Sequence, residues 1–247
     1  MKVLIMGGWG KVGRAVGHIV EQKYGCGASL ILDKTAPLPK KQKVDFLHVC
    51  IPFSKTFVQD VKRAMKSYPP KYVIVHSTVK VGTTRKLGDN AAHSPIRGQH
   101  DELTDSTKRF VKYVGGNTDK TGKQCKTHIE SLGLNVALWG KSEETELMKL
   151  LCLSRYLNDL SYYETAYNIC NRFKVPPERL QEWTSTYNQG YKDGSKGHFS
   201  RPELRYPHGV AGGTCVLPVS KMLFEQTNSD WLKRNIETFQ PKTCKSK

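Results

Sequence analysis

A cysteine late in the chain ends a run of small residues and could act as a nucleophile. The segment reads HGVAGGTC and closes on Cys215. Glycine lets a ligand approach the backbone closely, and a thiolate attacks electrophilic carbon. We therefore expect Gly212 and Gly213 to lie against a substrate and Cys215 to react with it. The alternative is a buried small apolar side chain, which is the usual environment of a cysteine thiol.

A second glycine-rich segment lies near the N-terminus, directly after the apolar run 2–6. It fits the pattern GxGxxG between a strand and a helix, where backbone N–H groups bind a pyrophosphate. An acidic residue ends the next expected strand; it would bind ribose hydroxyls and repel a 2′-phosphate, which favours NAD over NADP. The expected cofactor contacts are Gly8, Trp9, Gly10, Lys11, Val12, Gly13 and Asp33. The alternative is a glycine turn in a domain that binds no nucleotide.

Two further strand ends are expected to border the same cofactor. Pro52 follows the apolar run 46–51, and Ser77 and Thr78 follow the run 72–76. Ligands of open α/β sheets bind at the carboxyl ends of the strands. We therefore expect Pro52 and Ser77 to contact NAD.

Basic side chains in two places are candidates for binding an anionic substrate. His93, Arg97 and His100 form one group, and Arg201 precedes the cysteine segment. A guanidinium group binds a carboxylate or phosphate through two parallel hydrogen bonds. The alternatives are an ordinary polar loop around His93 and an ion pair between Arg201 and Glu203.

The elements that must position these residues alternate over residues 1–140. Short apolar runs predict strands at 2–6, 29–32, 46–51, 72–76, 112–115 and 135–138. Between them, helices are predicted at 11–22, 54–67, 83–90 and 118–131. Such alternation is typical of a parallel sheet with crossover helices. The predicted fold class is α/β, with a Rossmann-type NAD-binding domain at 1–140.

A smaller all-helical domain is predicted at 141–247, for substrate binding and dimerisation. Residues 142–173 contain neither proline nor glycine and predict one long helix, which would span roughly 45 Å and form the contact of a homodimer. Residues 177–200 predict a second helix and a polar loop. A closing helix is predicted at 220–239, followed by a frayed basic end.

Composition limits the classes of protein and partner. The 247 residues include seven cysteines, none at CxxC spacing, so we expect reduced thiols and no metal site. No apolar run reaches the roughly 20 residues of a membrane span, and the first apolar run is too short for a signal peptide, which favours a cytoplasmic protein. The net charge of +17 fits a polyanion or phosphorylated partner, or a solvated lysine-rich surface. Aromatic residues do not interleave the basic runs, which disfavours nucleic acid.

The motifs, in their order, resemble the UDP-glucose/GDP-mannose dehydrogenase family of the 6-phosphogluconate dehydrogenase-like superfamily. They are the loop from Gly8, the pair Ser77-Thr78, SPIRG at 94–98, ELMK at 146–149 and GGTC at 212–215. The resemblance implies NAD-dependent oxidation of a nucleotide-sugar alcohol to a carboxylate through a thioester on Cys215. It also implies that Lys149 stabilises an oxyanion and that Thr78 helps to hold a water. The alternative for Lys149 is a surface lysine.

The sequence departs from that family at several positions. Ile96 stands where the family has a catalytic glutamate, and Leu153 stands where it has an asparagine. The aspartate expected after the cysteine is missing, and we expect the chain to lack the family's third, nucleotide-binding domain. These departures leave three functions open. They are a four-electron oxidation through Cys215, a two-electron β-hydroxyacid-type oxidation assisted by Lys149, and binding of a dinucleotide or polyanion without chemistry.

Overall fold

The computed structural model describes residues 1–35, 39–98 and 102–240, apart from the side chain of Thr214. Its residues form two compact units, Met1–Lys149 and Leu150–Lys247, and each is described by itself. The predicted site residue His100 and the basic end after residue 240 lie outside the described residues.

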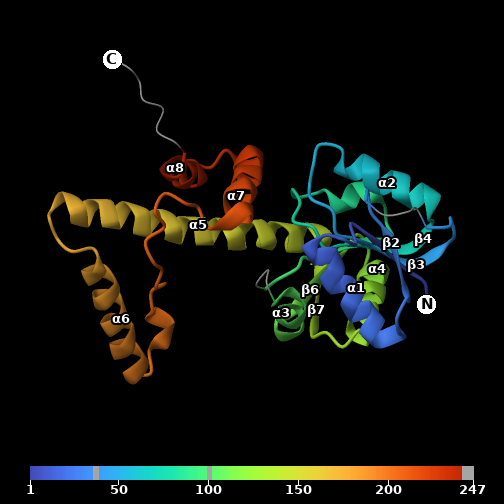
Figure 1. The fold of residues 1–247 in the computed structure, drawn as a ribbon, viewed down its shortest axis with the longest axis horizontal. Coiled ribbons are helices and arrows are strands. Elements are labelled where there is room, and N and C mark those ends of the chain that lie inside the picture. Colours follow the sequence, from blue (N-terminus) through green and yellow to red (C-terminus); the bar gives the residue numbers. More distant parts are fainter. Residues whose placement is uncertain (36–38, 99–101, 241–247) are drawn as a thin grey trace, which may run out of the picture. The chain divides into compact units, whose positions relative to one another are not determined.

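Unit 1 is built on a seven-stranded sheet with the strand order β2-β1-β3-β4-β5-β6-β7 (Figure 1). Its strands are β1 (Val3–Met6), β2 (Ser29–Leu32), β3 (Val44–Val49), β4 (Pro70–Val75), β5 (Ala91–His93), β6 (Lys112–Gly116) and β7 (Val136–Lys141). All neighbouring pairs are parallel except β5 and β6. The α/β fold class predicted from the sequence is confirmed.

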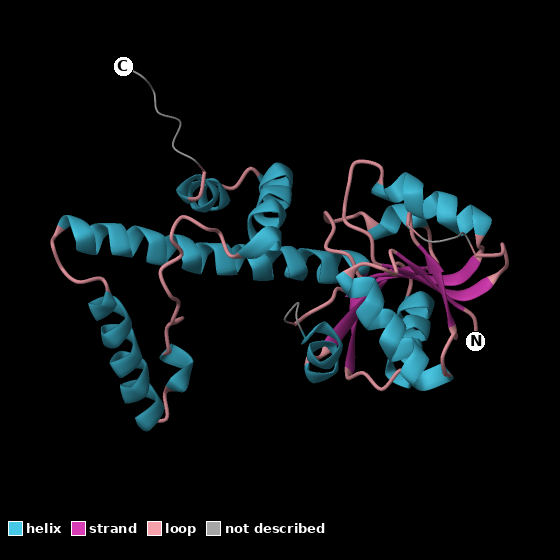
Figure 2. Cartoon of the chain, viewed as in Figure 1, coloured by secondary structure: helices cyan, strands magenta, loops and turns pink. Residues whose placement is uncertain are grey.

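Helices cover both faces of this sheet (Figure 2). Alternate residues of β1 point to opposite faces, as a strand requires. Val3 and Ile5 pack in one apolar cluster with α1 (Lys11–Tyr24) and α4 (Asp119–Ser131). Leu4 packs in a second cluster with α2 (Phe57–Ser67). After β1, the chain first adds β2 on one side of this strand and then adds β3 on its other side. In open α/β sheets, ligands bind where the strand order reverses in this way, here at the carboxyl ends of β1 and β3.

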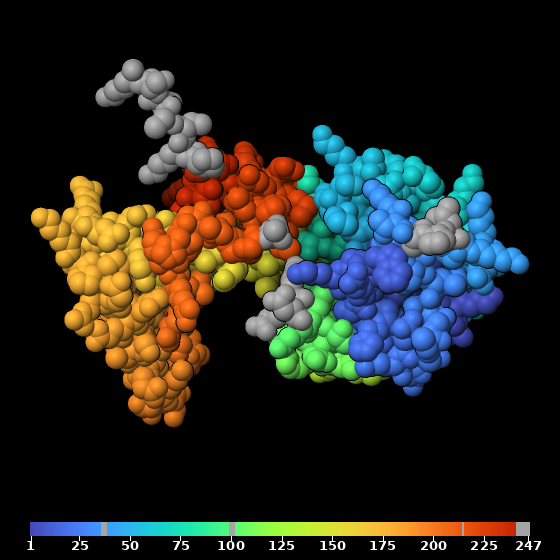
Figure 3. All heavy atoms as spheres, in the orientation of Figure 1, coloured from blue at the N-terminus to red at the C-terminus, as the bar shows by residue number. Residues whose placement is uncertain are grey.

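A short helix, α3 (Leu103–Arg109), lies beside α1 on the surface of unit 1 (Figure 3). Lys108 Nζ donates a hydrogen bond to Gln22 Oε1 at 2.8 Å between the two helices. Neither α3 nor β5 was among the predicted elements, because seven and three residues are too few to display a periodic apolar pattern. The helix predicted at 83–90 is a 3₁₀ turn, η1 (Thr84–Leu87), which ends at Gly88 with φ 110°.

Unit 2 is helical, as predicted. It contains most of α5 (Ser142–Arg172), then α6 (Glu178–Asp193), a 3₁₀ turn η3 (Gly197–Phe199), α7 (Gly213–Thr227) and α8 (Asp230–Thr238). The single closing helix predicted at 220–239 is wrong, since Asn228 adopts a left-handed conformation with φ 50° and divides two helices. The predicted helix also began at residue 220, whereas α7 begins at Gly213 and includes Pro218. No helix of the described residues is both long and apolar enough to cross a membrane.

Candidate functional site

The glycine loop between β1 and α1 is closely packed. Gly7 N donates to Leu32 O at 2.8 Å, and Arg14 N donates to Gly10 O at 2.9 Å at the start of α1. A Cβ atom at Gly13 would lie 2.1 Å from Gly7 O, so only glycine fits there. The amino end of α1 therefore lies directly after β1, where its backbone dipoles favour an anionic group such as a pyrophosphate.

Asp33 lies just beyond β2, beside this loop. Trp9 N donates to Asp33 Oδ2 at 3.0 Å, and the backbone and hydroxyl of Thr35 donate to Asp33 Oδ1 at 3.4 and 3.3 Å. These bonds, the one from Trp9 foremost, lower the pKa of Asp33. An ionised carboxylate at this position can accept hydrogen bonds from ribose hydroxyls and repels a 2′-phosphate. The indole of Trp9 is half exposed at the same loop.

The carboxyl ends of β3 and β4 are tied together by a hydroxyl. Ser77 Oγ donates to Ile51 O at 2.6 Å, in the segment that leads from β3 to the exposed Pro52. Thr78 follows Ser77 and is half-buried. These residues lie in the loops after neighbouring parallel strands, where the sequence placed them, and their contacts with NAD stay a prediction.

His93 is fully buried at the end of β5. Its Nε2 lies 3.1 Å from Ser77 O, which accepts, and its Nδ1 lies 2.8 Å from Thr145 Oγ1 in the first turn of α5. Burial lowers the pKa of His93 to about 3, so the imidazole is neutral. Both ring nitrogens are thus bound within the protein and hold three elements together.

Arg97 lies in the segment that follows β5. Its Nη1 donates to Val111 O at 3.4 Å. The guanidinium carbon lies 5.5 Å from the ring centre of Phe110 and 5.4 Å from that of Tyr113. Contacts of this kind between a guanidinium and an aromatic ring restrict the rotamers of the arginine. Its predicted role in binding a substrate anion stays a prediction.

Lys149 on α5 reaches the segment after β5. Its Nζ donates to Ile96 O at 2.9 Å. The side chain of Ile96, which stands where the resembling family has a glutamate, is buried in the apolar cluster under α1 and α4. At this position the chain therefore supplies a backbone carbonyl to Lys149 and no carboxylate.

Glu146, one helical turn before Lys149, fixes the start of α5. Its side chain is fully buried and accepts hydrogen bonds from Gly82 N at 2.6 Å and Thr84 N at 2.8 Å. Burial raises the pKa of Glu146, and these backbone donors favour its ionised form. Residues three apart lie on the same side of a helix, so this contact also orients Lys149.

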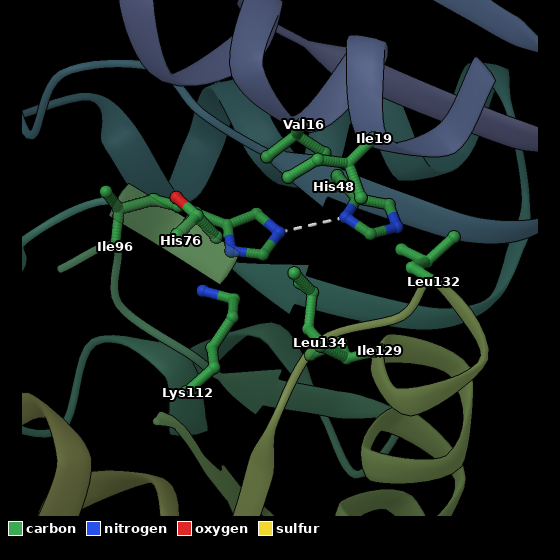
Figure 4. A pocket seen from close by; sticks show the side chains of 10 residues that line it. Val16, Ile19, His48, His76, Ile96, Lys112, Ile129, Leu132 and Leu134 are labelled. Atoms are coloured by element: carbon green, nitrogen blue, oxygen red, sulfur yellow. Dashed lines mark hydrogen bonds between the residues drawn. The ribbon is translucent and has the colours of Figure 1, made fainter. Parts of the chain in front are cut away.

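A chain of three buried histidines, which the sequence analysis did not identify, crosses the core of unit 1. Figure 4 shows two of them, His48 and His76, joined by a hydrogen bond. His48 Nδ1 lies 2.8 Å from His76 Nε2, and His48 Nε2 lies 3.0 Å from His128 Nε2. At the other end, His76 Nδ1 donates to Ser94 O at 2.9 Å. Burial lowers the pKa of all three histidines, to about 4 for His128.

Lys112 is a further buried basic residue that the sequence analysis did not identify. Its Nζ donates to Ser94 O at 2.7 Å and Pro95 O at 3.2 Å, and burial lowers its pKa to about 7. The sequence does contain a signal for these buried polar groups. His48 interrupts an apolar strand, His76 follows one and Lys112 begins one. A buried polar side chain requires a hydrogen-bond partner, and that requirement predicts such contacts.

Cys215, in unit 2, was expected to lie in a loop. It lies instead in the first turn of α7. The expectation failed because Gly212 and Gly213 were read as loop residues; both have left-handed φ values, 59° and 70°, and α7 begins at the second. A Cβ atom at Gly212 would lie 2.8 Å from Leu160 Cδ1, so this glycine packs closely on α5. The Cys215 residue is half-buried.

Arg201, the other predicted site residue of unit 2, is held by an aromatic side chain. Its guanidinium carbon lies 3.7 Å from the ring centre of Tyr187, and Nη2 donates to Tyr187 Oη at 2.8 Å. The ion pair considered between Arg201 and Glu203 is not among the described salt bridges; Glu203 Oε1 accepts from Asn188 Nδ2 at 2.7 Å.

The structure brings the predicted site residues together in three groups. The glycine loop meets Asp33, His93 meets Ser77, and Lys149 meets the Ile96 carbonyl, all in unit 1. Gly212, Gly213, Cys215 and Arg201 belong to unit 2. Within the described residues, no group of three or more His, Cys, Asp or Glu could hold a metal ion.

Comparison with known proteins relates this chain to others through its fold. No family model matches the sequence, and no curated protein matches it. Solved structures do match over nearly the whole chain. The UDP-D-ManNAc dehydrogenase of Pyrococcus horikoshii is 14% identical with a TM-score of 0.75, covering 96% of this chain and 68% of its own.

Two further matches are shorter proteins. The 3-hydroxyisobutyrate dehydrogenase of Mycobacterium tuberculosis, solved with L-serine, is 12% identical with a TM-score of 0.69 and coverages of 96% and 92%. Psf3, solved with NADP⁺ and 2-OPP, is 13% identical with a TM-score of 0.61 and the same coverages. The chain therefore has the same fold as the UDP-D-ManNAc dehydrogenase and the 3-hydroxyisobutyrate dehydrogenase.

Proposed function

We propose that this protein is an NAD-dependent oxidoreductase that oxidises an alcohol of an anionic small molecule. The observation that carries the proposal is the dinucleotide loop. Gly13 leaves room for Gly7 O, α1 begins directly after β1, and an ionised Asp33 lies beside the loop. The dehydrogenase fold and the carboxylate at the ribose position together favour NAD over NADP.

Lys149 is the proposed acid–base residue. NAD, when bound, would accept a hydride from the alcohol carbon. An amine whose position is set by the Ile96 carbonyl and by Glu146 can hydrogen-bond to the alcohol oxygen and stabilise negative charge on it. Thr78 is proposed to hold a water after β4. Arg97 and Arg201 remain the candidates for binding the anionic part of the substrate, whereas neutral His93 has both ring nitrogens bound within the protein.

The finer proposal assigns Cys215 as a nucleophile. In this version the thiol adds to the aldehyde formed by the first hydride transfer, and the adduct loses a second hydride to give a thioester. Water then cleaves the thioester to a carboxylate, and two NAD are reduced for each substrate. The position of Cys215 supports this assignment, because it closely follows Gly212 and Gly213, which carry no side chains to keep a substrate from the backbone, and is only half-buried. The two-electron alternative uses Lys149 without Cys215.

The experiment measures NADH formation with a panel of UDP-sugars, GDP-sugars and 3-hydroxyacids. We expect one class to be oxidised, with two NADH per substrate for the thioester route and one for the two-electron route. Cys215→Ser is expected to stop the four-electron reaction, with Cys152→Ser, an exposed cysteine on α5, as the control. Full turnover of Cys215→Ser would overturn the nucleophile assignment. Failure of NAD⁺ and NADH to bind in calorimetry would overturn the function itself.

We also propose that the protein forms a homodimer through α5. Three exposed apolar side chains recur on one side of this helix, at spacings of 11 and 18 residues from the first: Leu151, Tyr162 and Ile169. Exposed Phe173 follows directly after the helix ends. The exposed fractions of these four side chains reach 72% at Phe173, and such a stripe needs a partner in water. Light scattering should give twice the chain mass. Tyr162→Lys with Ile169→Lys should give the monomer mass, and an unchanged mass would contradict this surface.

A second candidate function is suggested by the net charge of +17. A dinucleotide-fold protein with this charge could bind a polyanion without catalysis. That function predicts binding that weakens steeply with salt while no NADH forms with any alcohol. Titration with heparin at two salt concentrations, beside the substrate panel, separates it from the dehydrogenase.

A further inference from the structure

The segment 94–96 leaves the sheet after β5 with all of its backbone polar groups bonded. Ser94 N donates to Val75 O at 2.8 Å, and Ile96 N donates to His76 O at 3.4 Å. Among the described residues, the three carbonyls accept from side chains, namely His76, Lys112 and Lys149. Complete pairing of buried backbone groups is a general requirement of folded proteins. Here lysine side chains meet most of that requirement.

The strand register explains why a lysine lies here. β5 and β6 are antiparallel, and His93 pairs with Gly115, so the same register would place Lys112 opposite Ile96. The pairing stops before that point, because Pro95 has no N–H group to donate. Lys112 begins β6, and its amine supplies N–H donors to Ser94 O and Pro95 O where the ladder has ended.

His76 contributes the second donor to Ser94 O, and its tautomer follows from that contact. A carbonyl only accepts, so His76 Nδ1 carries the proton and Nε2 accepts from His48 Nδ1. His48 Nε2 then accepts from His128 Nε2. The chain therefore has one direction and no charge, and it ends at His128 Nδ1, which lacks a hydrogen-bond partner within the described residues. The carbonyl at its other end cannot pass a proton on.

The groups that face Lys112 place no acid beside it among the described interactions. They are the thiol of Cys50, the amine of Lys149 and three imidazoles, those of His48, His76 and His93. Burial lowers the pKa of Lys112 to about 7 and raises that of Cys50 to about 12. A neutral amine still has two N–H groups, one for each carbonyl. Lys112 can therefore hold Ser94 and Pro95 in either protonation state.

We propose that Lys112 is a positioning residue for Lys149. It holds in place the segment 94–96, whose Ile96 carbonyl accepts a hydrogen bond from Lys149. The two lysines do not share an acceptor. Lys112 holds the two carbonyls that precede Ile96, and Lys149 donates to the third. This clamp on segment 94–96 fixes where the Lys149 amine stands before substrate binds. Its importance for catalysis rests on the proposed function of Lys149.

The test compares how fast Lys149 reacts with acetic anhydride in the wild type and in Lys112→Met, read by mass spectrometry. Exposed Lys62 on α2 serves as the internal reference. Methionine keeps the length of the side chain and removes its donors. We expect Lys149 to react about two- to tenfold faster in Lys112→Met, the fold-change that loss of one net hydrogen bond gives. Equal reaction rates in two folded proteins would overturn the proposal.

Two controls keep the result specific. Ile129 on α4 lines a small cavity together with Ile96 and Lys112 (Figure 4). Ile129→Val should leave the reaction of Lys149 unchanged, and an equal acceleration there would overturn the clamp in favour of general loosening. Lys112→Arg retains N–H donors, so Lys149 in this variant is expected to react as slowly as in the wild type. If Lys112→Met fails to fold, the reaction rate of Lys149 is compared between Lys112→Arg and Lys112→Gln. Equal rates of Lys149 in these two variants would again overturn the proposal.

A kinetic readout follows once the substrate is identified. Lys112→Met should lower kcat while KM for NAD stays unchanged, because the glycine loop and Asp33 are not altered. The labelling requires neither cofactor nor substrate. Its failure would overturn the clamp and leave the dehydrogenase proposal standing. A wild type that forms no NADH would overturn the proposed function and leave the labelling result intact.

Discussion

Gly13 faces the carbonyl oxygen of Gly7 so closely that a Cβ atom at residue 13 would lie 2.1 Å from that oxygen. No carbon and oxygen atoms approach to this distance without a bond, so a side chain at residue 13 must displace either the loop or α1. The contact joins the end of β1 to the first turn of α1. The shape of the cofactor loop and the packing of the helix therefore depend on one another.

Gly13→Ala is expected to abolish measurable NAD binding and to lower the melting temperature. The displaced loop no longer presents its N–H groups to a pyrophosphate, and the helix loses its contact with the sheet. Gly17→Ala is the matched control, since it lies one turn further along α1 and its Cβ would lie 3.4 Å from Ile5 Cδ1 and 4.0 Å from Ser29 Oγ. Calorimetric titration and thermal unfolding measure both effects. NAD affinity equal to the wild type in Gly13→Ala would contradict the assigned loop.

Asp33→Ala tests the choice of cofactor. Removing the carboxylate removes the acceptor for the ribose hydroxyls and the charge that repels a 2′-phosphate. We expect the affinity for NADH to fall about tenfold or more, as for loss of a charged hydrogen bond, while that for NADPH rises relative to it. Asp60→Ala on α2 is the control, because Asp60 pairs with Arg63 at the surface. A ratio of affinities that does not change would exclude Asp33 from the ribose site.

The sequence predicted those parts of the molecule that follow from local patterns. The β1 loop, Asp33 and the long helix α5 all have periodic or motif signals within a single segment. Elements without such a signal were missed, as β5 with its three residues illustrates. The start of α7 was missed for another reason. Two left-handed glycines can begin a helix as well as form a loop, and nothing local to the sequence decides between these outcomes.

The buried contacts of unit 1 depend on tertiary structure and could not be predicted in detail. His48, His76 and His128 are separated by up to 80 positions, and only the strand order brings the three imidazoles into one chain. Lys112 meets Ser94 because the antiparallel register of β5 and β6 places them together. A polar residue in an apolar strand signals that a partner exists, but the sequence does not identify that partner.

Stability should decrease in acid because the buried histidines stay neutral when folded. Their folded pKa values lie below the ordinary value of 6.5, so between pH 6.5 and about 4 the unfolded chain binds protons that the folded chain does not. Each such histidine lowers the free energy of unfolding by about 1.4 kcal/mol per pH unit in that range. The effect is absent above pH 6.5.

Urea unfolding at pH 7 and pH 5 measures this loss. His48→Leu removes one of the titrating groups and should show a smaller difference between the two pH values than the wild type, although it is less stable at both. Less stability at both pH values is expected because His76 Nε2 loses its donor. His18→Gln, an exposed histidine on α1, should leave the difference unchanged. A wild type as stable at pH 5 as at pH 7 would contradict a neutral chain.

Glu146→Gln should destabilise unit 1 and disturb Lys149. The amide oxygen can accept from only one of Gly82 N and Thr84 N while its NH₂ group faces the other donor, which costs about 1–3 kcal/mol for a buried unpaired group. Glu143→Gln on the same helix removes an exposed pair with Arg85 and should have a smaller effect. Denaturant unfolding compares the two variants. Equal stability of both would show that the buried carboxylate does not fix the start of α5.

Lys112 should make the protein more stable as the pH rises above neutral, by the same linkage that acts on the histidines in acid. Its folded pKa of about 7 lies below the ordinary value of 10.5, so between these values the unfolded chain holds a proton that the folded chain has released. The free energy of unfolding therefore rises by about 1.4 kcal/mol per pH unit from this residue. Above pH 9 the buried thiols of Cys50 and Cys125 act in the opposite direction, since burial raises their pKa values to about 12.

The window from pH 7.5 to 8.5 isolates the lysine from both the histidines and the cysteines. Urea unfolding across it should give a positive slope in the wild type that is absent in Lys112→Met. Lys108→Met on α3 removes an exposed lysine and should keep the slope. A wild-type slope that Lys112→Met retains in full would mean that the amine keeps its proton inside the protein. The two carbonyls of Ser94 and Pro95 would then be held by a charged ammonium with a third N–H group, and the lowered pKa of Lys112 would be wrong.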